Sequence, residues 1–160
     1  GLPQLVGNVA FDLRHMFGAI DRDSYLSRFK GVQKFDAAAD ADLAETVRST
    51  TMPADRIFVF GFAPSVYLDS ERQSASRFFW SRPVILEFAA DHAGYGSDGL
   101  LRDLEATRPA VVALQKQDWS PDVANSRDFF TSTPTLNAWL TSHYALEDDT
   151  PIFEVWRRKP

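Results

Sequence analysis

The sequence predicts an α/β protein, a three-layer sandwich in which a mixed, Rossmann-like sheet has helices on both faces. The segments Ile57 to Phe60 and Ala110 to Leu114 are apolar at every position, which is typical of strands covered on both faces. Segments with helical spacing of apolar residues alternate with these strands. Near the C-terminus, two extended segments flank the turn at residues 148–151, which predicts an antiparallel hairpin.

The chain divides into two parts by charge. Residues 1–35 carry five basic and three acidic side chains, whereas residues 36–160 carry 12 basic and 19 acidic ones. In the first part, apolar residues recur every three or four positions from Leu2 to Phe17, and Gly18 follows them. This spacing predicts an amphipathic helix that can lie beside a membrane. We therefore expect a helical N-terminal segment, residues 1–35, and an α/β domain, residues 36–160.

The first half of the α/β domain predicts a helix, a strand and a short helix. A helix is expected over residues 40–49, with Asp40 as its N-cap. A turn over residues 52–55 then leads to the first buried strand, which Gly61 ends. Pro64 is suited to the first position of the next helix.

The second half continues the alternation. Residues 76–80 are a strand candidate, and residues 84–88 are a third strand or part of a loop. A short helix is expected over residues 99–107 before the strand that begins at Ala110. Residues 118–128 are polar and predict a loop. Thr133 is the expected cap of a final helix that begins at Pro134.

Composition excludes several classes of protein. The 160 residues include no cysteine, so disulfides, a cysteine nucleophile and cysteine-bound metals are excluded. The net charge is −5, whereas a dedicated nucleic-acid binder has a basic surplus. The H-E-x-x-H and G-x-S-x-G patterns do not occur. We therefore expect no nucleic-acid partner, no metal, no cofactor and no catalytic residue within this chain.

One glycine-rich motif suggests an alternative. Gly94, Gly96 and Gly99 match the G-x-G-x-x-G pattern, and Asp118 follows 19 residues later. In dinucleotide-binding folds such glycines bring backbone amides to a pyrophosphate at a helix start, and an acidic residue binds the ribose. The alternative function is thus a stand-alone nucleotide- or dinucleotide-binding α/β protein, and a glycine-rich surface loop is the structural explanation of the same pattern.

A second stretch combines arginines with aromatic residues. It contains Tyr67, Arg72, Ser76 and Arg77, which are followed by an aromatic run. Arginine binds carboxylate or phosphate in a forked geometry, so these four residues are candidates for contact with a substrate or phosphate. The structural alternative is that the two arginines pair with nearby acids or a helix end and fix the turn.

This stretch resembles the soluble C-terminal domain of bacterial polytopic membrane glycosyltransferases of the dolichyl-phosphate-mannose–protein mannosyltransferase-like superfamily. The resemblance covers roughly residues 25–158. Phe62 departs from the family pattern, in which a polar or acidic residue is more usual, and residues 94–99 have no counterpart in it. The matching positions are Thr51, Pro53, Asp55, Ile57 to Gly61, Pro64, Tyr67, Arg72, Ser76, Arg77, Phe78, Trp80, Pro109 to Val112 and Phe153 to Arg158.

The resemblance implies a function for the parent protein. Members of this family transfer a sugar from a polyprenyl-phosphate donor to a glycan, lipid or protein acceptor, and their catalytic acid lies in the membrane part. The resemblance therefore implies a domain that is not itself catalytic, that shapes the acceptor side of the active site or recruits the acceptor, and that contacts its own transmembrane domain. It also implies a periplasmic or other extracytoplasmic location, tethered to the inner membrane.

Overall fold

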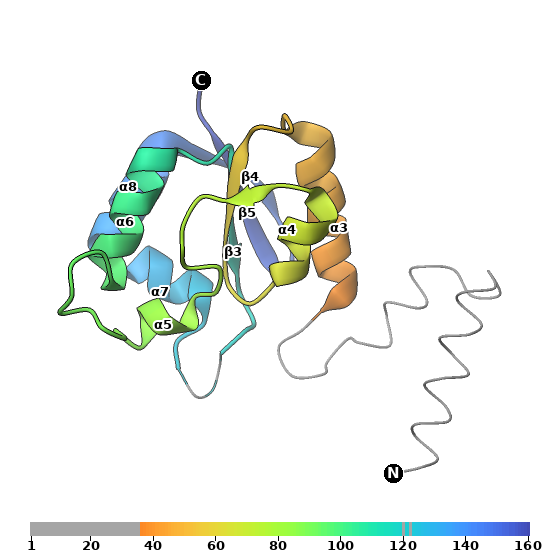
Figure 1. Ribbon diagram of the computed structural model, residues 1–160. Coiled ribbons are helices and arrows are strands. Elements are labelled where there is room, and N and C mark those ends of the chain that lie inside the picture. Colours follow the sequence, from red (N-terminus) through yellow and green to blue (C-terminus); the bar gives the residue numbers. More distant parts are fainter. Residues whose placement is uncertain (1–35, 120, 122) are drawn as a thin grey trace, which may run out of the picture.

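The computed structural model describes residues 36–119, 121 and 123–160. Its elements alternate helix and strand up to the second strand, then two pairs of helices flank the third strand in the sequence before the C-terminal hairpin (Figure 1). The predicted helix over Leu2 to Phe17 lies outside the described residues. The elements are α3 (Ala37–Thr50), β1 (Arg56–Phe60), α4 (Pro64–Ser70), β2 (Gln73–Ser74), α5 (Arg82–Ile85), α6 (Gly96–Thr107), β3 (Val111–Gln115), α7 (Ser126–Ser132), α8 (Pro134–His143), β4 (Tyr144–Asp149) and β5 (Phe153–Arg158).

A mixed five-stranded sheet forms the middle layer, in the order β2-β1-β3-β5-β4. β1 pairs in parallel with β2 and β3, whereas β5 pairs antiparallel with β3 and β4. Helices α3 and α4 cover one face, and α5 to α8 lie on the other (Figure 1). The predicted α/β class, the helices on both faces and the C-terminal hairpin are confirmed.

The two central strands are apolar throughout because each face of the sheet has its own core. Ile57 and Val59 of β1 pack toward α3 and α4. Phe58 and Phe60, between them in the sequence, pack toward α6, α7 and α8. β3 alternates in the same way, because Ile57 pairs with Val111 and the register continues in step. Alternate side chains of a strand point to opposite faces, so an uninterrupted apolar strand needs two covering layers.

The region between α4 and α6 differs from the prediction. The strand beside β1 is Gln73–Ser74, and residues 76–80 form bends instead of the predicted strand. Residues 84–88 were expected to be a third strand or part of a loop, but the first two of them form the end of α5 (Arg82–Ile85). Pro83 lies in the first turn of α5, and the Ser81 carbonyl accepts hydrogen bonds from the amides of Val84 and Ile85. Proline favours a helix start because its φ is already helical, so residues 82–85 turn into a helix.

Two helix starts also differ from the prediction. Asp36 caps α3, and its Oδ1 accepts a hydrogen bond from the Ala39 amide at 3.0 Å. The predicted cap, Asp40, lies inside the first turn. The polar segment expected as a loop over residues 118–128 contains the start of α7, where Asn125 accepts from the Asp128 amide at 2.9 Å. The cap of α3 thus lies four residues before the predicted one, and α7 begins inside a segment that was expected to be a loop.

Asp40 joins the two helices on its face of the sheet. It is 2% exposed, and Ser65 Oγ of α4 donates to its Oδ2 at 2.7 Å. Burial raises the pKa of Asp40 to about 6; the Ser65 hydrogen bond opposes this shift, and the charges of Asp36 and Asp69 add to it. The Asp40 carboxylate is therefore less stable in the folded chain than in water.

We expect this carboxylate to make stability depend on pH. The pKa of Asp40 is about 6 in the folded chain and 3.8 in the reference state, so the folded chain binds the proton more tightly. Stability should therefore fall by roughly 2 kcal/mol as pH rises from about 4 to about 6. Denaturant unfolding at a series of pH values should show a smaller fall in Asp40→Asn. Asp42→Asn, on the exposed side of α3, is the control, and equal falls in all three proteins would contradict the prediction.

Candidate functional site

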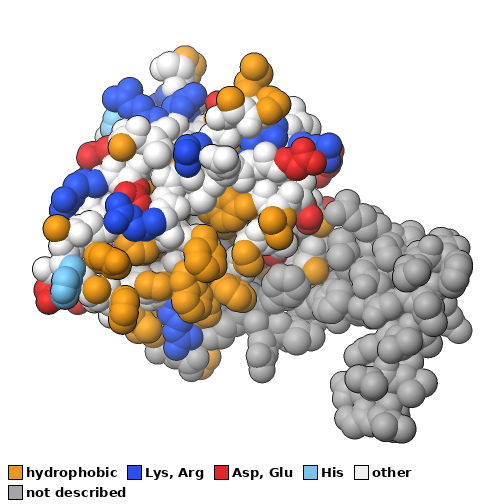
Figure 2. Space-filling view, viewed as in Figure 1, with side chains coloured by type: hydrophobic (Ala, Val, Ile, Leu, Met, Phe, Trp, Pro, Cys, Tyr) orange, Lys and Arg blue, Asp and Glu red, His pale blue; other side chains and the backbone are white. Residues whose placement is uncertain are grey.

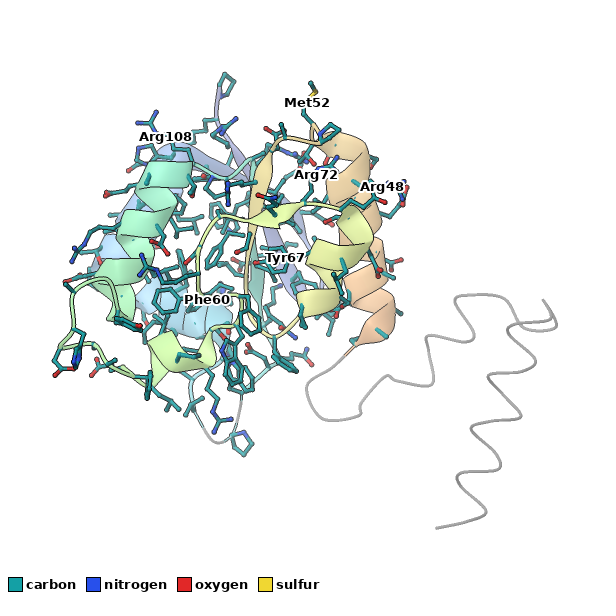
Figure 3. All side chains as sticks on the ribbon, in the orientation of Figure 1. Arg48, Met52, Phe60, Tyr67, Arg72 and Arg108 are labelled. Atoms are coloured by element: carbon teal, nitrogen blue, oxygen red, sulfur yellow. The ribbon has the colours of Figure 1, made fainter. Side chains whose placement is uncertain are left out.

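The arginine stretch predicted as a contact site forms two structural anchors. Arg72 is 7% exposed, and it lies between the ends of α3 and α4 (Figure 3). Its guanidinium donates to Thr51 Oγ1 at 2.9 Å, to the Thr51 carbonyl at 2.8 Å and to the Ser70 carbonyl at 2.9 Å. The Arg48 carbonyl accepts a longer bond of 3.3 Å. Arg72 thus holds a helix end, as in the structural alternative.

Ser76 and Arg77 converge on Asp103 of α6. Ser76 Oγ donates to Asp103 Oδ2 at 2.8 Å, and Arg77 donates to both carboxylate oxygens at 3.2 and 3.0 Å. Burial of Asp103 opposes ionisation, but these hydrogen bonds outweigh it and hold the pKa of Asp103 below its ordinary value. The pair fixes the segment after β2 to α6, and the Arg77 guanidinium remains at the surface.

Tyr67 is the fourth predicted contact residue, and its hydroxyl forms a hydrogen bond within the fold. The Val59 amide donates to Tyr67 Oη at 2.8 Å, and burial raises the pKa of Tyr67. The hydroxyl therefore joins α4 to β1. The four predicted residues are close in sequence, but the structure gives Arg72 and Tyr67 roles within the α3 and α4 layer and turns Ser76 and Arg77 toward α6.

The glycine motif opens α6, but turns and not a strand lead into it. Residues 86–95 follow α5 as turns. Gly94 and Gly96 have positive φ values of 89° and 65°. A Cβ at Gly99 would lie 2.2 Å from the Gly94 carbonyl oxygen. These glycines therefore let the loop fold back on the first turn of α6, a structural reason for the pattern that is independent of any ligand.

A different group of residues gathers where the two central parallel strands end. Open α/β sheets bind ligands at the carboxyl ends of their strands. Phe62 follows β1 and Trp119 follows β3, and their rings lie 5.6 Å apart. Trp80 lies 6.0 Å from Phe62 and 6.1 Å from Trp119, and Phe79 stacks beside Trp80 at 6.2 Å. We call Phe62, Phe79, Trp80 and Trp119 the aromatic cluster.

Buried polar side chains hold the cluster in place. Gln115 Oε1, at the end of β3, accepts a hydrogen bond from the Phe62 amide at 2.7 Å. The Trp119 indole N–H donates to Ser81 Oγ at 2.6 Å. Ser81 Oγ in turn contacts Ser126 Oγ, which hydrogen-bonds to Asp118. Phe62 is therefore anchored to the end of β3, and Trp119 is anchored through Ser81 to Ser126 at the start of α7.

Asp118, the acidic residue of the nucleotide alternative, belongs to this anchor. It is 1% exposed, and the Ser126 amide donates to its Oδ1 at 2.8 Å. Burial raises the pKa of Asp118, and the Ser126 hydrogen bonds oppose that shift. Ser81 and Ser126 are both 0% exposed, so neither hydroxyl is open to a substrate. The network fixes the start of α7 and the Trp119 ring.

The outer side of the cluster is apolar and exposed. Phe79 is 52% exposed, and Leu86 and Phe88, just after α5, are 51% and 67% exposed. Apolar side chains gather over α5 in the space-filling view (Figure 2). The Arg82 guanidinium lies 5.2 Å from the centre of the Trp119 ring, a cation–π distance. Exposed aromatic and arginine side chains of this kind are typical of contact surfaces.

Sequence reasoning missed this cluster, although one signal was present. Phe62 comes two residues after the first of the apolar segments that predict parallel strands, and Trp119 comes five residues after the second. Carboxyl ends of neighbouring parallel strands meet at one edge of a sheet, so the two aromatic residues are expected at the same end of the domain.

Comparisons with protein-family models, curated proteins and solved structures found no match to this chain. Among residues 36–119, 121 and 123–160, no three acidic or histidine side chains are grouped so that they could hold a metal ion. No helix of this part combines the length and apolar character that crossing a bilayer requires.

Proposed function

We propose that the chain is a non-catalytic domain of a membrane glycosyltransferase that transfers a sugar from a polyprenyl-phosphate donor. In this proposal the domain shapes the acceptor site or recruits the acceptor, which is a glycan, a lipid or a protein. The domain contacts its own transmembrane part, on the periplasmic or another extracytoplasmic side of the inner membrane. The proposal rests on the sequence resemblance together with the aromatic cluster.

The aromatic cluster is the observation that favours binding over catalysis. Phe79 is exposed and Phe62 and Trp80 are half-buried, whereas Trp119 is buried and the serine and aspartate side chains beneath the rings are buried and hydrogen-bonded to one another. Such an arrangement offers a rigid apolar surface with Arg82 at its margin. Tryptophan and arginine residues dominate the binding energy of many interfaces. A surface of this chemistry suits an acceptor or a neighbouring domain.

The first test is the reading frame that encodes the chain. If the proposal is correct, the frame upstream of Gly1 encodes several apolar segments of about 20 residues each, with an acidic residue in the first extracytoplasmic loop. A frame with no such segments would contradict the membrane part of the proposal.

The second test uses the full-length enzyme in membranes. Phe79→Ser should raise the KM for the acceptor about tenfold, because it removes an exposed ring from the contact surface, and should leave donor hydrolysis without acceptor unchanged. Leu68→Ser is the matched control, because Leu68 is 79% exposed and lies on α4, outside the cluster. Equal acceptor kinetics in the two variants would contradict a role of the cluster in acceptor recruitment.

A further inference from the structure

A hollow lies at the opposite end of the domain from the aromatic cluster, where α6 and α8 end (Figure 3). It has a volume of about 780 Å³. Its lining carries three basic side chains, Arg108, Arg158 and Lys159, together with His143 and one acidic residue, Glu105. Arg108 is labelled at this end of the molecule in Figure 3, and Lys and Arg side chains gather there in Figure 2.

Two of these cations are held in place by helix ends. Arg158 donates to the carbonyl of Arg108, the residue that follows α6. Lys159 Nζ donates to the carbonyls of Thr141 and Ser142 in the last turn of α8, at 2.8 and 3.3 Å. Within the described part of the chain, no carboxylate forms an ion pair with Arg108, Arg158 or Lys159. None of the three cations is therefore engaged in a direct ion pair.

Arg108 has an unusual backbone conformation. Its φ is 46°, in the left-handed region, where glycine is the less strained residue at a helix end. Among the described residues, its guanidinium has no hydrogen-bond or ion-pair partner. The fold thus places a long cationic side chain at a strained position without using it internally. Glu71 has the same conformation at the end of α4, so the unpaired guanidinium and not the backbone distinguishes Arg108.

Directed donors, and not a surplus of charge, favour an anion in the hollow. Three cations are offset by Glu105, by the Pro160 carboxylate of the chain Gly1 to Pro160 and by about half a negative charge at each of the two helix C-termini. A phosphate would therefore be bound by hydrogen bonds from the guanidinium groups. Arg108 and Arg158 also both act on the Tyr144 hydroxyl, where they lower its pKa against the larger effect of burial, which raises it to about 12. Both guanidinium groups therefore lie near the same wall of the hollow.

We propose that this hollow binds a phosphate group, with Arg108, Arg158 and Lys159 as the donors. A guanidinium donates to two phosphate oxygens at once, and an ammonium adds a point charge beside it. His143 donates its Nδ1 proton to the Trp139 carbonyl at 2.8 Å, so its ring is held in the wall of the hollow and is not counted among the donors. The phosphate belongs either to a soluble molecule or to a lipid headgroup. This proposal does not rest on the proposed glycosyltransferase function.

The test measures binding of inorganic pyrophosphate to the chain Gly1 to Pro160 by calorimetry, with ¹⁵N spectra to locate the site. Arg108→Gly removes the charge and relieves the strained φ, so this variant should unfold at no lower temperature than the unmodified chain. Its affinity for pyrophosphate should nevertheless fall about tenfold, as should that of Lys159→Gln. Arg48→Gln is the control, because Arg48 is an exposed arginine of α3 outside the hollow.

Vesicles distinguish the two sources of phosphate. The same variants are mixed with vesicles of phosphatidylcholine alone and of phosphatidylcholine with phosphatidylglycerol. Binding to the anionic vesicles that falls in Arg108→Gly and Lys159→Gln supports a lipid headgroup, and variant-sensitive binding of pyrophosphate alone supports a soluble phosphate. The proposal is overturned if neither ligand binds the unmodified chain more tightly than the double variant Arg108→Gly/Lys159→Gln. It is also overturned if Arg48→Gln loses as much affinity as Arg108→Gly.

Discussion

Replacing Arg72 with methionine is expected to lower the free energy of unfolding by about 3 to 4 kcal/mol. Methionine keeps the apolar stem and its packing but removes every donor of the guanidinium. The carbonyls of Thr51 and Ser70 would then lose their charged hydrogen bonds at a buried position. An unpaired buried polar group costs its full desolvation energy, and bonds to charged groups are among the strongest. Denaturant unfolding followed by far-UV circular dichroism would measure the loss.

The matched control is Arg77→Met, because Arg77 donates its hydrogen bonds at the surface of the same stretch. Its effect should be much smaller, since exposed ion pairs contribute little to stability. If the two variants unfold at the same denaturant concentration, Arg72 does not support the helix ends as described. A large loss in Arg72→Met would also mean that lost activity in an Arg72 variant is no evidence of contact with substrate.

Replacing Gly61 with alanine should also have a large effect and lower the free energy of unfolding by about 3 kcal/mol. A Cβ at Gly61 would lie 2.6 Å from the Gln115 Cβ and 2.4 Å from its Oε1. The Gln115 Cβ is fixed to β3, so β1 and β3 would have to separate at their carboxyl ends. The hydrogen bond from the Phe62 amide to Gln115 would be lost with them. Thermal unfolding would report the stability loss, and tryptophan fluorescence would report a displaced aromatic cluster.

A double variant separates this clash from other causes. Gln115→Gly alone should destabilise the chain, because it removes the partner of the Phe62 amide and packing at the end of β3. In Gly61→Ala/Gln115→Gly, however, both the Cβ and the Oε1 that a Cβ at residue 61 would meet are absent, so the clash is relieved. The double variant should therefore lose less stability than the two single losses added together. Additive losses would show that Gly61 is needed for a reason other than its contact with Gln115.

The architecture was predictable because its strongest signals are local. The apolar segments that became β1 and β3 identify buried strands, and Pro64 and Pro134 begin the helices expected at them. The errors arose where local signals were ambiguous. Pro83 is compatible with a loop, an edge strand or a helix start, and only the hydrogen bonds from Val84 and Ile85 to Ser81 decide for a helix.

The candidate site was less predictable because it depends on contacts between distant parts of the sequence. Arg72 and Arg77 look alike in the sequence, yet the fold buries the first against helix carbonyls and leaves the second at the surface. The contact between Trp119 and Ser81 joins residues 38 positions apart. Position after a strand suggests that Phe62 and Trp119 meet, but the hydrogen bonds that fix them follow only from the packed structure.

The two margins of the sheet bear on how the protein behaves at high concentration. An edge strand has unpaired backbone groups to which a strand of another chain can add, and proteins protect their edge strands by making them short, bulged or charged. One margin, β2, has only two residues. At the other, β4 has an irregularity between Leu146 and Asp148 and carries three successive acidic residues, Glu147, Asp148 and Asp149. Repulsion between these acids disfavours pairing of two β4 margins, so self-association by strand addition, and with it aggregation, is opposed at both sides of the sheet.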